Sequence, residues 1–252
     1  MEAISKTPQY PDSKFTGLDW IRSAIFAVGL VAITIPYGVL LGAVGWLLPL
    51  AIRFKLVRQW RKLFIALERY VLGIKVRVVG REHIPDHACV VISNHQSAWE
   101  TVGLQELFKP CVFVLKEELL RIPFFGWGLA SIRMIAIDRS AGKEALKHVA
   151  QQGEDRLKQS ISVVVFPEGT RAAPGEVLPY QIGGAFLASK CKATVVPIAH
   201  NAGLIWPRNS FVKKPGVVTV VIGEPIDASS MKPQVLNATV EEWIRREANK
   251  LV

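Results

Sequence analysis

A histidine and a glutamate follow a short apolar segment at a spacing that suits proton transfer. Residues 90–92 are Val-Val-Ile, which favour a strand, and the polar turn after them leads into a segment with helical character. We expect His95 at the mouth of a sheet, where a bend at the start of the helix would bring the carboxylate of Glu100 to the imidazole. Such a carboxylate would make the histidine a better proton acceptor. A loop histidine with a solvated glutamate would have the same spacing, so the pair needs support from elsewhere.

Three further predicted strands end in loops that carry charged or glycine residues. These loops hold Lys116, Arg139, Glu168, Gly169, Thr170 and Arg171. Parallel strands open their carboxyl ends at one edge of a sheet, so the loops would gather around the histidine. The guanidinium groups of Arg139 and Arg171 suit a phosphate, and Gly169 would let the backbone approach a ligand with exposed N–H groups. Taken singly, an ion pair of Asp138 with Arg139 or an ordinary Pro-Glu-Gly turn explains these residues, but their order behind strands favours a shared site.

The overall composition indicates a partner that is both apolar and anionic. Half of the 252 residues are hydrophobic, the mean hydropathy is +0.27 and the net charge is +10. This pairing is typical of a protein that works at a phospholipid surface. The positive mean hydropathy and the lack of a Lys/Arg-rich tail argue against nucleic acid as the partner. Cys89, Cys111 and Cys191 are widely spaced and odd in number, which favours reduced thiols over a disulfide framework or a zinc site.

An uncharged segment near the amino terminus predicts membrane insertion. Residues 24–52 carry no charge, and about 20 apolar residues are enough to cross a bilayer. Pro36 and Pro49, together with nearby glycines, would either kink one spanning helix or divide the segment into two helices of a re-entrant hairpin. A cleaved signal peptide is a further interpretation, although the segment is longer than a signal h-region and has no clear cleavage site.

Residues 53–72 are predicted to form a basic amphipathic helix. The segment holds six Lys or Arg residues against one Glu, and its apolar residues recur every three or four positions. Such a helix can lie in the headgroup layer with its cations on anionic lipid. The positive-inside bias then predicts that the chain after this helix lies in the cytoplasm. The alternative is a helix that packs on the globular domain with a solvated basic face.

Residues 73–252 alternate strand and helix patterns, which predicts an α/β domain with a mixed, mainly parallel sheet flanked by helices. Residues 1–72 would be a membrane-anchoring helical region in front of this domain. The strands are expected at residues 74–80, 88–92, 112–115, 132–137, 161–166, 193–198 and 217–222. The helices are expected at residues 98–108, 142–159, 183–191 and 233–251, with an aromatic loop at 116–128.

Four blocks of the chain resemble the PlsC-type 1-acyl-sn-glycerol-3-phosphate acyltransferase family. They are Asn94-His95 with Glu100, residues 116–139, residues 166–171 and residues 196–198. The third block, Phe-Pro-Glu-Gly-Thr-Arg, is the most specific of the four. The first block departs from the family pattern, because Glu100 stands where the family usually has an aspartate. The resemblance covers roughly residues 76–223 and implies a glycerolipid acyltransferase-like fold.

The resemblance also implies roles for the residues in these blocks. His95 would be the catalytic base and Glu100 the acid that orients it. The second and third blocks would bind the glycerol phosphate of the acceptor. The substrate-binding residues implied are Lys116, Arg139, Glu168, Gly169, Thr170 and Arg171.

The implied reaction is acyl transfer to lysophosphatidic acid. His95 would remove the proton of the sn-2 hydroxyl, and the alkoxide would attack the thioester of acyl-CoA or an acyl carrier protein, giving phosphatidic acid. Direct transfer without a covalent acyl-enzyme is expected, with no cofactor and no metal ion. An apolar groove would hold the acyl chain, and Phe124, Phe125 and Trp127 are candidates for its wall unless they are ordinary core residues.

Other functions are compatible with the same residues. An acyltransferase with another acceptor, such as glycerol 3-phosphate or a lyso-ornithine lipid, would use the same base. The arginines favour an acceptor with a phosphate, but they do not determine how many acyl chains the acceptor carries. A non-catalytic module would use its basic residues to hold anionic lipid, and its behaviour would not depend on His95.

Overall fold

The chain folds around one mixed β-sheet. The structure, a computed structural model, describes residues 15–138 and 141–251. In this part of the chain, eight strands form a sheet in the order β1-β7-β6-β2-β5-β3-β4, with β8 paired to β6. The strands are β1 (Ile74–Val79), β2 (Val90–Ser93), β3 (Cys111–Lys116), β4 (Ile135–Ile137), β5 (Ser162–Val165), β6 (Thr194–His200), β7 (Gly216–Ile222) and β8 (Ile226–Asp227). The strands from β6 to β4 are parallel neighbours and β6 is antiparallel to β7, so the predicted mixed, mainly parallel sheet is confirmed.

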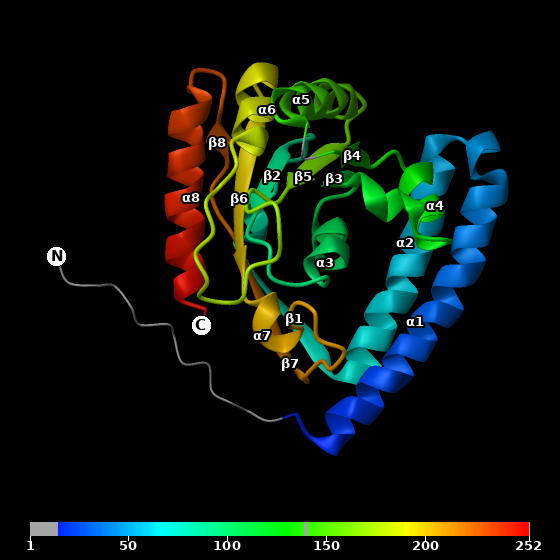
Figure 1. The fold of residues 1–252 in the computed structure, drawn as a ribbon. Coiled ribbons are helices and arrows are strands. Elements are labelled where there is room, and N and C mark those ends of the chain that lie inside the picture. The colour runs from blue at the N-terminus through cyan, green and yellow to red at the C-terminus, as the bar shows by residue number, and fades with distance from the viewer. Residues whose placement is uncertain (1–14, 139–140, 252) are drawn as a thin grey trace.

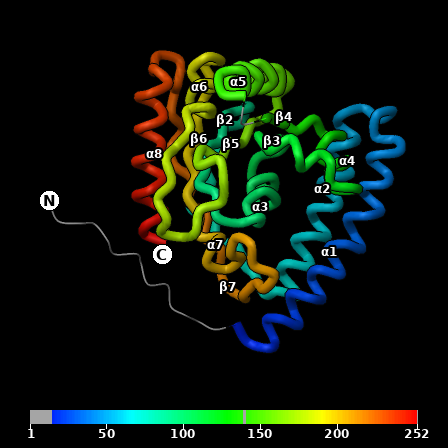
Figure 2. The backbone as a smooth tube through the Cα atoms, viewed as in Figure 1, coloured from blue at the N-terminus to red at the C-terminus, as the bar shows by residue number. Residues whose placement is uncertain are grey.

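Helices cover both faces of the sheet. The helices are α1 (Gly17–Val44), α2 (Leu50–Leu67), α3 (Glu100–Leu107), α4 (Phe125–Ser131), α5 (Lys143–Lys158), α6 (Gly183–Cys191), α7 (Ala202–Ile205) and α8 (Pro233–Asn249). Helices α5, α6 and α8 pack on one face, and α3 lies on the other face, between the sheet and a hairpin of α1 and α2 (Figure 1). The backbone tube shows this helical hairpin as the outer layer of its side (Figure 2).

The two strands that lead to the predicted site are buried on both faces. Every residue of β2 and β5 is buried, as expected for Val- and Ile-rich strands of a parallel sheet between helices. The two strands pair in parallel register, with Ile92 opposite Val165. The loops that carry His95 and residues 166–171 therefore leave the sheet side by side at its carboxyl edge.

The amino-terminal region forms a helical hairpin. Helix α1 begins with a capping box, in which the Thr16 hydroxyl accepts the N–H of Asp19 and the Asp19 carboxylate accepts the N–H of Thr16. The helix continues through Pro36, and the chain reverses at residues 45–49, where a 3₁₀ turn and a proline precede α2. The break between the two helices therefore lies at the second proline of the uncharged segment and not at the first.

Helix α1 has the length and surface of a membrane segment. Its 28 residues extend about 42 Å. Residues 17–47 are the single stretch, within the described residues, that is long and apolar enough to cross a membrane. The exposed apolar side chains of α1 include Leu18, Ile21, Ile25, Val28, Val31, Ile35 and Val39. Their spacing places them along one side of the helix, and no other part of the described chain covers that side. Membrane insertion of the hairpin stays a prediction, either across the bilayer or from one side.

Helix α2 packs on the globular domain through one of its sides. Its Arg61 is buried and donates to the Glu106 carboxylate on α3 at 2.8 Å, and Phe64 lies in the core. Glu68, in the π-helical turn Glu68–Leu72 that ends this segment, accepts the indole N–H of Trp99 at 2.7 Å. The structure therefore shows the second alternative for residues 53–72, a helix that packs on the globular domain and leaves cations exposed, and contact of these cations with anionic lipid stays a prediction. These exposed cations are Lys55, Arg58, Lys62 and Arg69.

Three details differ from the sequence-based expectation. The segment expected as an aromatic loop contains a 3₁₀ helix, Glu117–Arg121, and the short helix α4. The strand expected from residue 132 begins only at Ile135. The short elements α7 and β8 were not expected. Helix α4 escapes prediction because two of its seven residues are glycines, which are poor helix formers, and its contacts with α1 are tertiary.

Candidate active site

His95 and Glu100 form a hydrogen-bonded pair at the carboxyl edge of the sheet. The Nδ1 atom of His95 lies 2.6 Å from Oε1 of Glu100, and this oxygen also accepts the backbone N–H groups of Gln96 and Ser97 at 2.9 Å. The predicted pair is therefore brought together. Glu100 is the first residue of α3, so the partial positive charge of the helix amino terminus also favours its carboxylate.

Burial strongly affects the Glu100 carboxyl group. Its side chain is 0% exposed, and Oε2 has no hydrogen-bond partner among the described residues. Burial by itself raises the pKa of Glu100, but the hydrogen bonds from His95 and Ser97 and the electrostatic attraction to His95 outweigh burial and hold the pKa below its ordinary value. The group is therefore a carboxylate at neutral pH, able to stabilise an imidazolium on His95.

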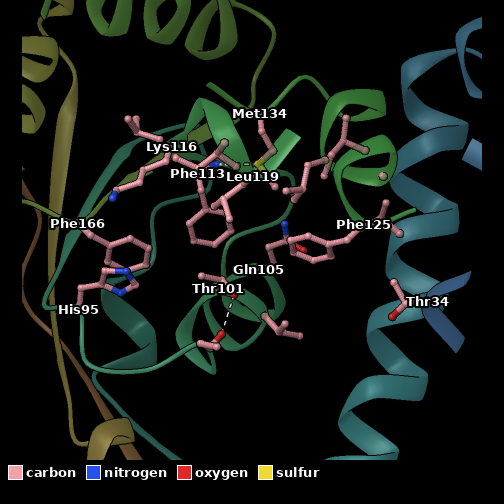
Figure 3. Close-up of a pocket in the computed structure, with 18 of the residues that line it drawn as sticks. Thr34, His95, Thr101, Gln105, Phe113, Lys116, Leu119, Phe125, Met134 and Phe166 are labelled. Carbon is pink, nitrogen blue, oxygen red and sulfur yellow. Dashed lines mark hydrogen bonds between the residues drawn. The ribbon is translucent and has the colours of Figure 1, made fainter. Parts of the chain in front are cut away.

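The His95 ring is held with its second nitrogen free for chemistry. The ring stacks on Phe166, with centroids 4.3 Å apart and an interplanar angle of 12°, and the side chain is 14% exposed. With Nδ1 bound to the carboxylate, Nε2 has no hydrogen-bond partner within the described residues. Figure 3 shows the ring at one end of a cavity, next to Phe166. The geometry leaves Nε2 as the atom that could take a proton from a bound molecule.

The loop before the histidine is fixed by residues of the neighbouring strands. The Asn94 side chain accepts the N–H of His200 and donates to its C=O, and the His200 imidazole contacts the C=O of Asn94 at 2.9 Å. The C=O of His95 accepts the N–H of Ala172 at 2.8 Å, and the N–H of His95 donates to Glu168. These contacts join the loops after β2, β5 and β6 into one rigid unit.

One cavity connects the histidine to the helical hairpin. Its volume is about 510 Å³, within the usual range for a small-molecule site. The loops next to the histidine contribute residues that are mostly polar: Lys116, Gly169, Thr170, Arg171, Arg208 and Asn209. Apolar residues, drawn in part in Figure 3, line most of the remainder: Gly38, Leu41, Val57, Trp60, Phe113, Leu115, Leu119, Phe124, Phe125, Leu129, Ile132 and Met134. The cavity can therefore hold a molecule with an anionic end and a long apolar end.

Four of the predicted substrate-binding residues border this cavity with His95. They are Lys116, Gly169, Thr170 and Arg171. Glu168 does not border it; its carboxyl group receives the N–H of His95 at 3.2 Å, and burial raises its pKa to about 8. This placement lets Glu168 hold the catalytic loop, and its contact with substrate stays a prediction. Arg139 lies outside the described residues.

The backbone beside Gly169 offers donors to an anion. Gly169 has a φ of 69°, which glycine adopts without strain. The backbone N–H groups of Thr170 and Arg171 make no hydrogen bond to the described protein atoms, and neither does the Arg171 guanidinium. An anionic group beside these residues would therefore meet unpaired donors from both backbone and side chain.

The sequence reasoning missed several cavity residues. Thr34 and Tyr37 come from α1, and Gln105 comes from α3. Arg208 and Asn209 follow Trp206-Pro207, a turn signal at the carboxyl side of a predicted strand, which could have directed attention to them. Of the three aromatic candidates for the groove wall, Phe124 and Phe125 border the cavity, whereas Trp127 packs against α1 at Gly42 instead. Residues 15–138 and 141–251 contain no cluster of three or more metal-ligating side chains.

Comparison with known proteins decides the family. A profile of the family described as Acyltransferase matches residues 75–201. A 1-acyl-sn-glycerol-3-phosphate acyltransferase of Pseudomonas aeruginosa is 43% identical over 228 residues, which are 89% of each chain. The chain belongs to the acyltransferase family. Members of this family are enzymes, and the family resemblance drawn from the four sequence blocks is confirmed.

Further relatives of this acyltransferase agree with that assignment. A yeast 1-acyl-sn-glycerol-3-phosphate acyltransferase is 30% identical over 191 residues, 73% of this chain and 63% of the yeast protein. The crystal structure of the 1-acyl-sn-glycerophosphate acyltransferase PlsC from Thermotoga maritima matches with a TM-score of 0.73. The match covers 92% of this acyltransferase and 95% of that protein, at 24% identity, and shows a shared fold.

Proposed function

We propose that this enzyme transfers a fatty acyl group from a thioester to the sn-2 hydroxyl of 1-acyl-glycerol 3-phosphate, giving phosphatidic acid. The observation that carries the proposal is that His95, paired with Glu100, borders one end of a cavity that both cations and a long apolar wall line. A lysophosphatidic acid bound there would have its phosphate at the cations and its acyl chain along the apolar wall. Its free hydroxyl lies between these two parts of the molecule.

The chemistry follows from the state of the histidine. Nε2 of His95 takes the hydroxyl proton while the alkoxide attacks the thioester carbonyl, and Glu100 stabilises the imidazolium that forms. The tetrahedral intermediate expels the thiolate, which takes the proton from His95. The ester bond forms as the thioester bond breaks, and the histidine returns to its starting state. A covalent acyl-enzyme is not needed, and the Cys89 and Cys111 thiols are buried with raised pKa values.

The substrates supply everything else that the reaction requires. The donor is acyl-CoA or an acyl carrier protein, both of which present a thioester, and it acts as a co-substrate. We propose no cofactor or metal ion. The acceptor's phosphate interacts with Arg171, Lys116 and the backbone N–H groups beside Gly169, because these donors border the cavity.

We place the enzyme at a phospholipid bilayer, with the helical hairpin inserted and the catalytic domain facing the cytoplasm of a bacterial-type inner membrane. The exposed apolar side of α1 supports insertion, and the exposed cations of α2 suit anionic headgroups. The cavity borders the hairpin through Tyr37 and Trp60, so an acceptor in the membrane would have a short path to His95.

The direct test is an assay of the purified full chain in lipid vesicles, with lysophosphatidic acid and a thioester donor. The wild type should form phosphatidic acid, and His95→Ala should lower the rate by about 10²-fold or more while vesicle binding is retained. His148→Ala, which changes an exposed histidine on α5, is the matched control and should behave as wild type. Faster acylation of glycerol 3-phosphate than of lysophosphatidic acid would favour the other acceptor. Vesicle binding without any thioester cleavage would favour a non-catalytic lipid-binding module.

A further inference from the structure

A turn between α7 and β7 brings two polar side chains to the cavity. Arg208 and Asn209 form the tip of this turn, and both border the cavity. Trp206 anchors the turn, because its ring is buried against Phe26 and Phe64 with centroid distances of 5.3 and 6.1 Å. Trp206 therefore ties the start of this turn to the core.

The Arg208 guanidinium is already oriented by protein contacts. It donates to the backbone C=O of Arg171, and its second terminal nitrogen lies 3.0 Å from Oε2 of Glu176. Glu176 is itself held by the N–H of Ala173 at 2.7 Å. The Arg208 side chain is 36% exposed, and a guanidinium has five N–H donors, so donors remain for a ligand.

Arg208 and Arg171 both border the cavity, and the Arg208 guanidinium contacts the Arg171 backbone, so the two residues are neighbours there. The Arg171 guanidinium has no partner in the described part of the chain, whereas Arg208 is balanced by one carboxylate. A phosphate monoester carries roughly 1.5 to 2 negative charges near pH 7, whereas a phosphodiester carries one. Two guanidiniums match the monoester better, because each can make paired charge-assisted hydrogen bonds to its oxygens.

We propose that Arg208 is a specificity-determining residue that binds, together with Arg171, the phosphate monoester of the acceptor. The Glu176 carboxylate competes with the headgroup for the Arg208 guanidinium, so only a headgroup that attracts Arg208 strongly makes this contact. A doubly charged monoester meets this condition better than a singly charged diester does. The inference rests on the proposed function, since it assigns a residue outside the four sequence blocks to the same headgroup.

The experiment compares two acceptors with one thioester donor. The acceptors are lysophosphatidic acid, a monoester, and lysophosphatidylglycerol, a diester. Arg208→Gln removes the charge, Arg208→Lys keeps the charge without the planar fork, and Glu176→Gln removes the competing carboxylate. The control is Arg246→Ala, which changes an exposed arginine on α8 that does not border the cavity.

In Arg208→Gln, KM for lysophosphatidic acid should rise at least about tenfold with kcat and the donor's KM little changed. The preference for lysophosphatidic acid over the diester, as a ratio of kcat/KM, should fall by a similar factor. The KM and the acceptor preference of Arg208→Lys should lie between those of Arg208→Gln and wild type. Glu176→Gln should weaken the acceptor preference by raising kcat/KM for the diester. The control should match wild type.

An unchanged acceptor preference in both Arg208 variants, beside an active wild type, would overturn the inference and leave the proposed function intact. A uniform loss of kcat with both acceptors would overturn it too, because that result would mean that Arg208 only supports the Arg171 backbone. If the wild type acylates neither lysophospholipid, the proposed function fails and the inference fails with it.

Discussion

Asn94 and His200 are 106 positions apart in the sequence and share three hydrogen bonds at the base of the catalytic loop. The Asn94 amide bonds both backbone groups of His200, and the His200 ring bonds the C=O of Asn94. Burial lowers the pKa of His200, which keeps the ring neutral, and its Nδ1 accepts the N–H of Ala202 while Nε2 donates to Asn94. The relationship fixes the backbone on which His95 stands.

Removing the His200 ring should disturb catalysis without a direct contact to substrate. We expect His200→Ala to leave the C=O of Asn94 unpaired and a space in the core, at a cost of about 2–4 kcal/mol in the free energy of unfolding. The rate constant kcat should fall by about tenfold or more, because His95 is less firmly oriented, with KM values little changed. Thermal unfolding and steady-state kinetics measure the two effects. Unaltered kcat in a destabilised variant would restrict His200 to a purely structural role.

The negative charge of Glu100 should matter more than its shape. In Glu100→Gln the amide oxygen can still accept the N–H groups of Gln96 and Ser97, but it cannot stabilise an imidazolium on His95. We expect kcat to fall by about 10²-fold or more. Glu100→Asp keeps the charge on a shorter side chain, so its kcat should fall less. Equal activity of wild type and the Gln variant would show that the carboxylate is not needed for proton transfer.

Glu168 should make the protein less stable as the pH rises. Burial raises the pKa of Glu168 to about 8 in the folded chain, above its ordinary value of 4.5. The fold therefore favours the protonated form, and the stability that Glu168 contributes is fully present below pH 4.5 and is lost as the pH rises through 8. Glu168→Gln cannot lose a proton. The melting temperature of this variant minus that of wild type should therefore increase from pH 5 to pH 9. A difference that stays constant over this range would contradict the raised pKa.

A glycine on α1 should be essential for the contact between the helical hairpin and α4. A Cβ atom on Gly38 would lie 2.4 Å from the C=O oxygen of Phe124, which itself has a φ of 63° at the centre of a tight turn. Gly38→Ala should therefore push α4 away from α1, lower the melting temperature and reduce activity by altering the cavity wall. Gly17→Ala is the matched control on the same helix, because a Cβ there meets no atom within 4 Å. The two variants should differ clearly in thermal unfolding, and similar behaviour would argue against a close α1–α4 contact.

Local sequence patterns determined the elements that carry the chemistry. The Val-Val-Ile strand before His95, the glutamate five positions later and the Phe-Pro-Glu-Gly-Thr-Arg turn behind another apolar strand are all short-range signals. Each arises from the side-chain period of a strand or from the conformational freedom of turn residues. The uncharged segment likewise predicted membrane insertion from its composition, as one kinked helix or as two helices of a hairpin.

The tertiary structure decided which of these elements are neighbours. The order of strands in the sheet places β2 between β5 and β6, which brings His200 to Asn94 and Ala172 to the catalytic loop. Strand pairing depends on contacts between distant segments, and a periodic pattern of apolar residues does not encode which partner a buried strand takes. For the same reason, only the folded chain shows that Arg208 and residues of the helical hairpin line the cavity. The raised pKa of Glu168 also depends on the folded chain, because the surrounding residues remove its carboxyl group from water.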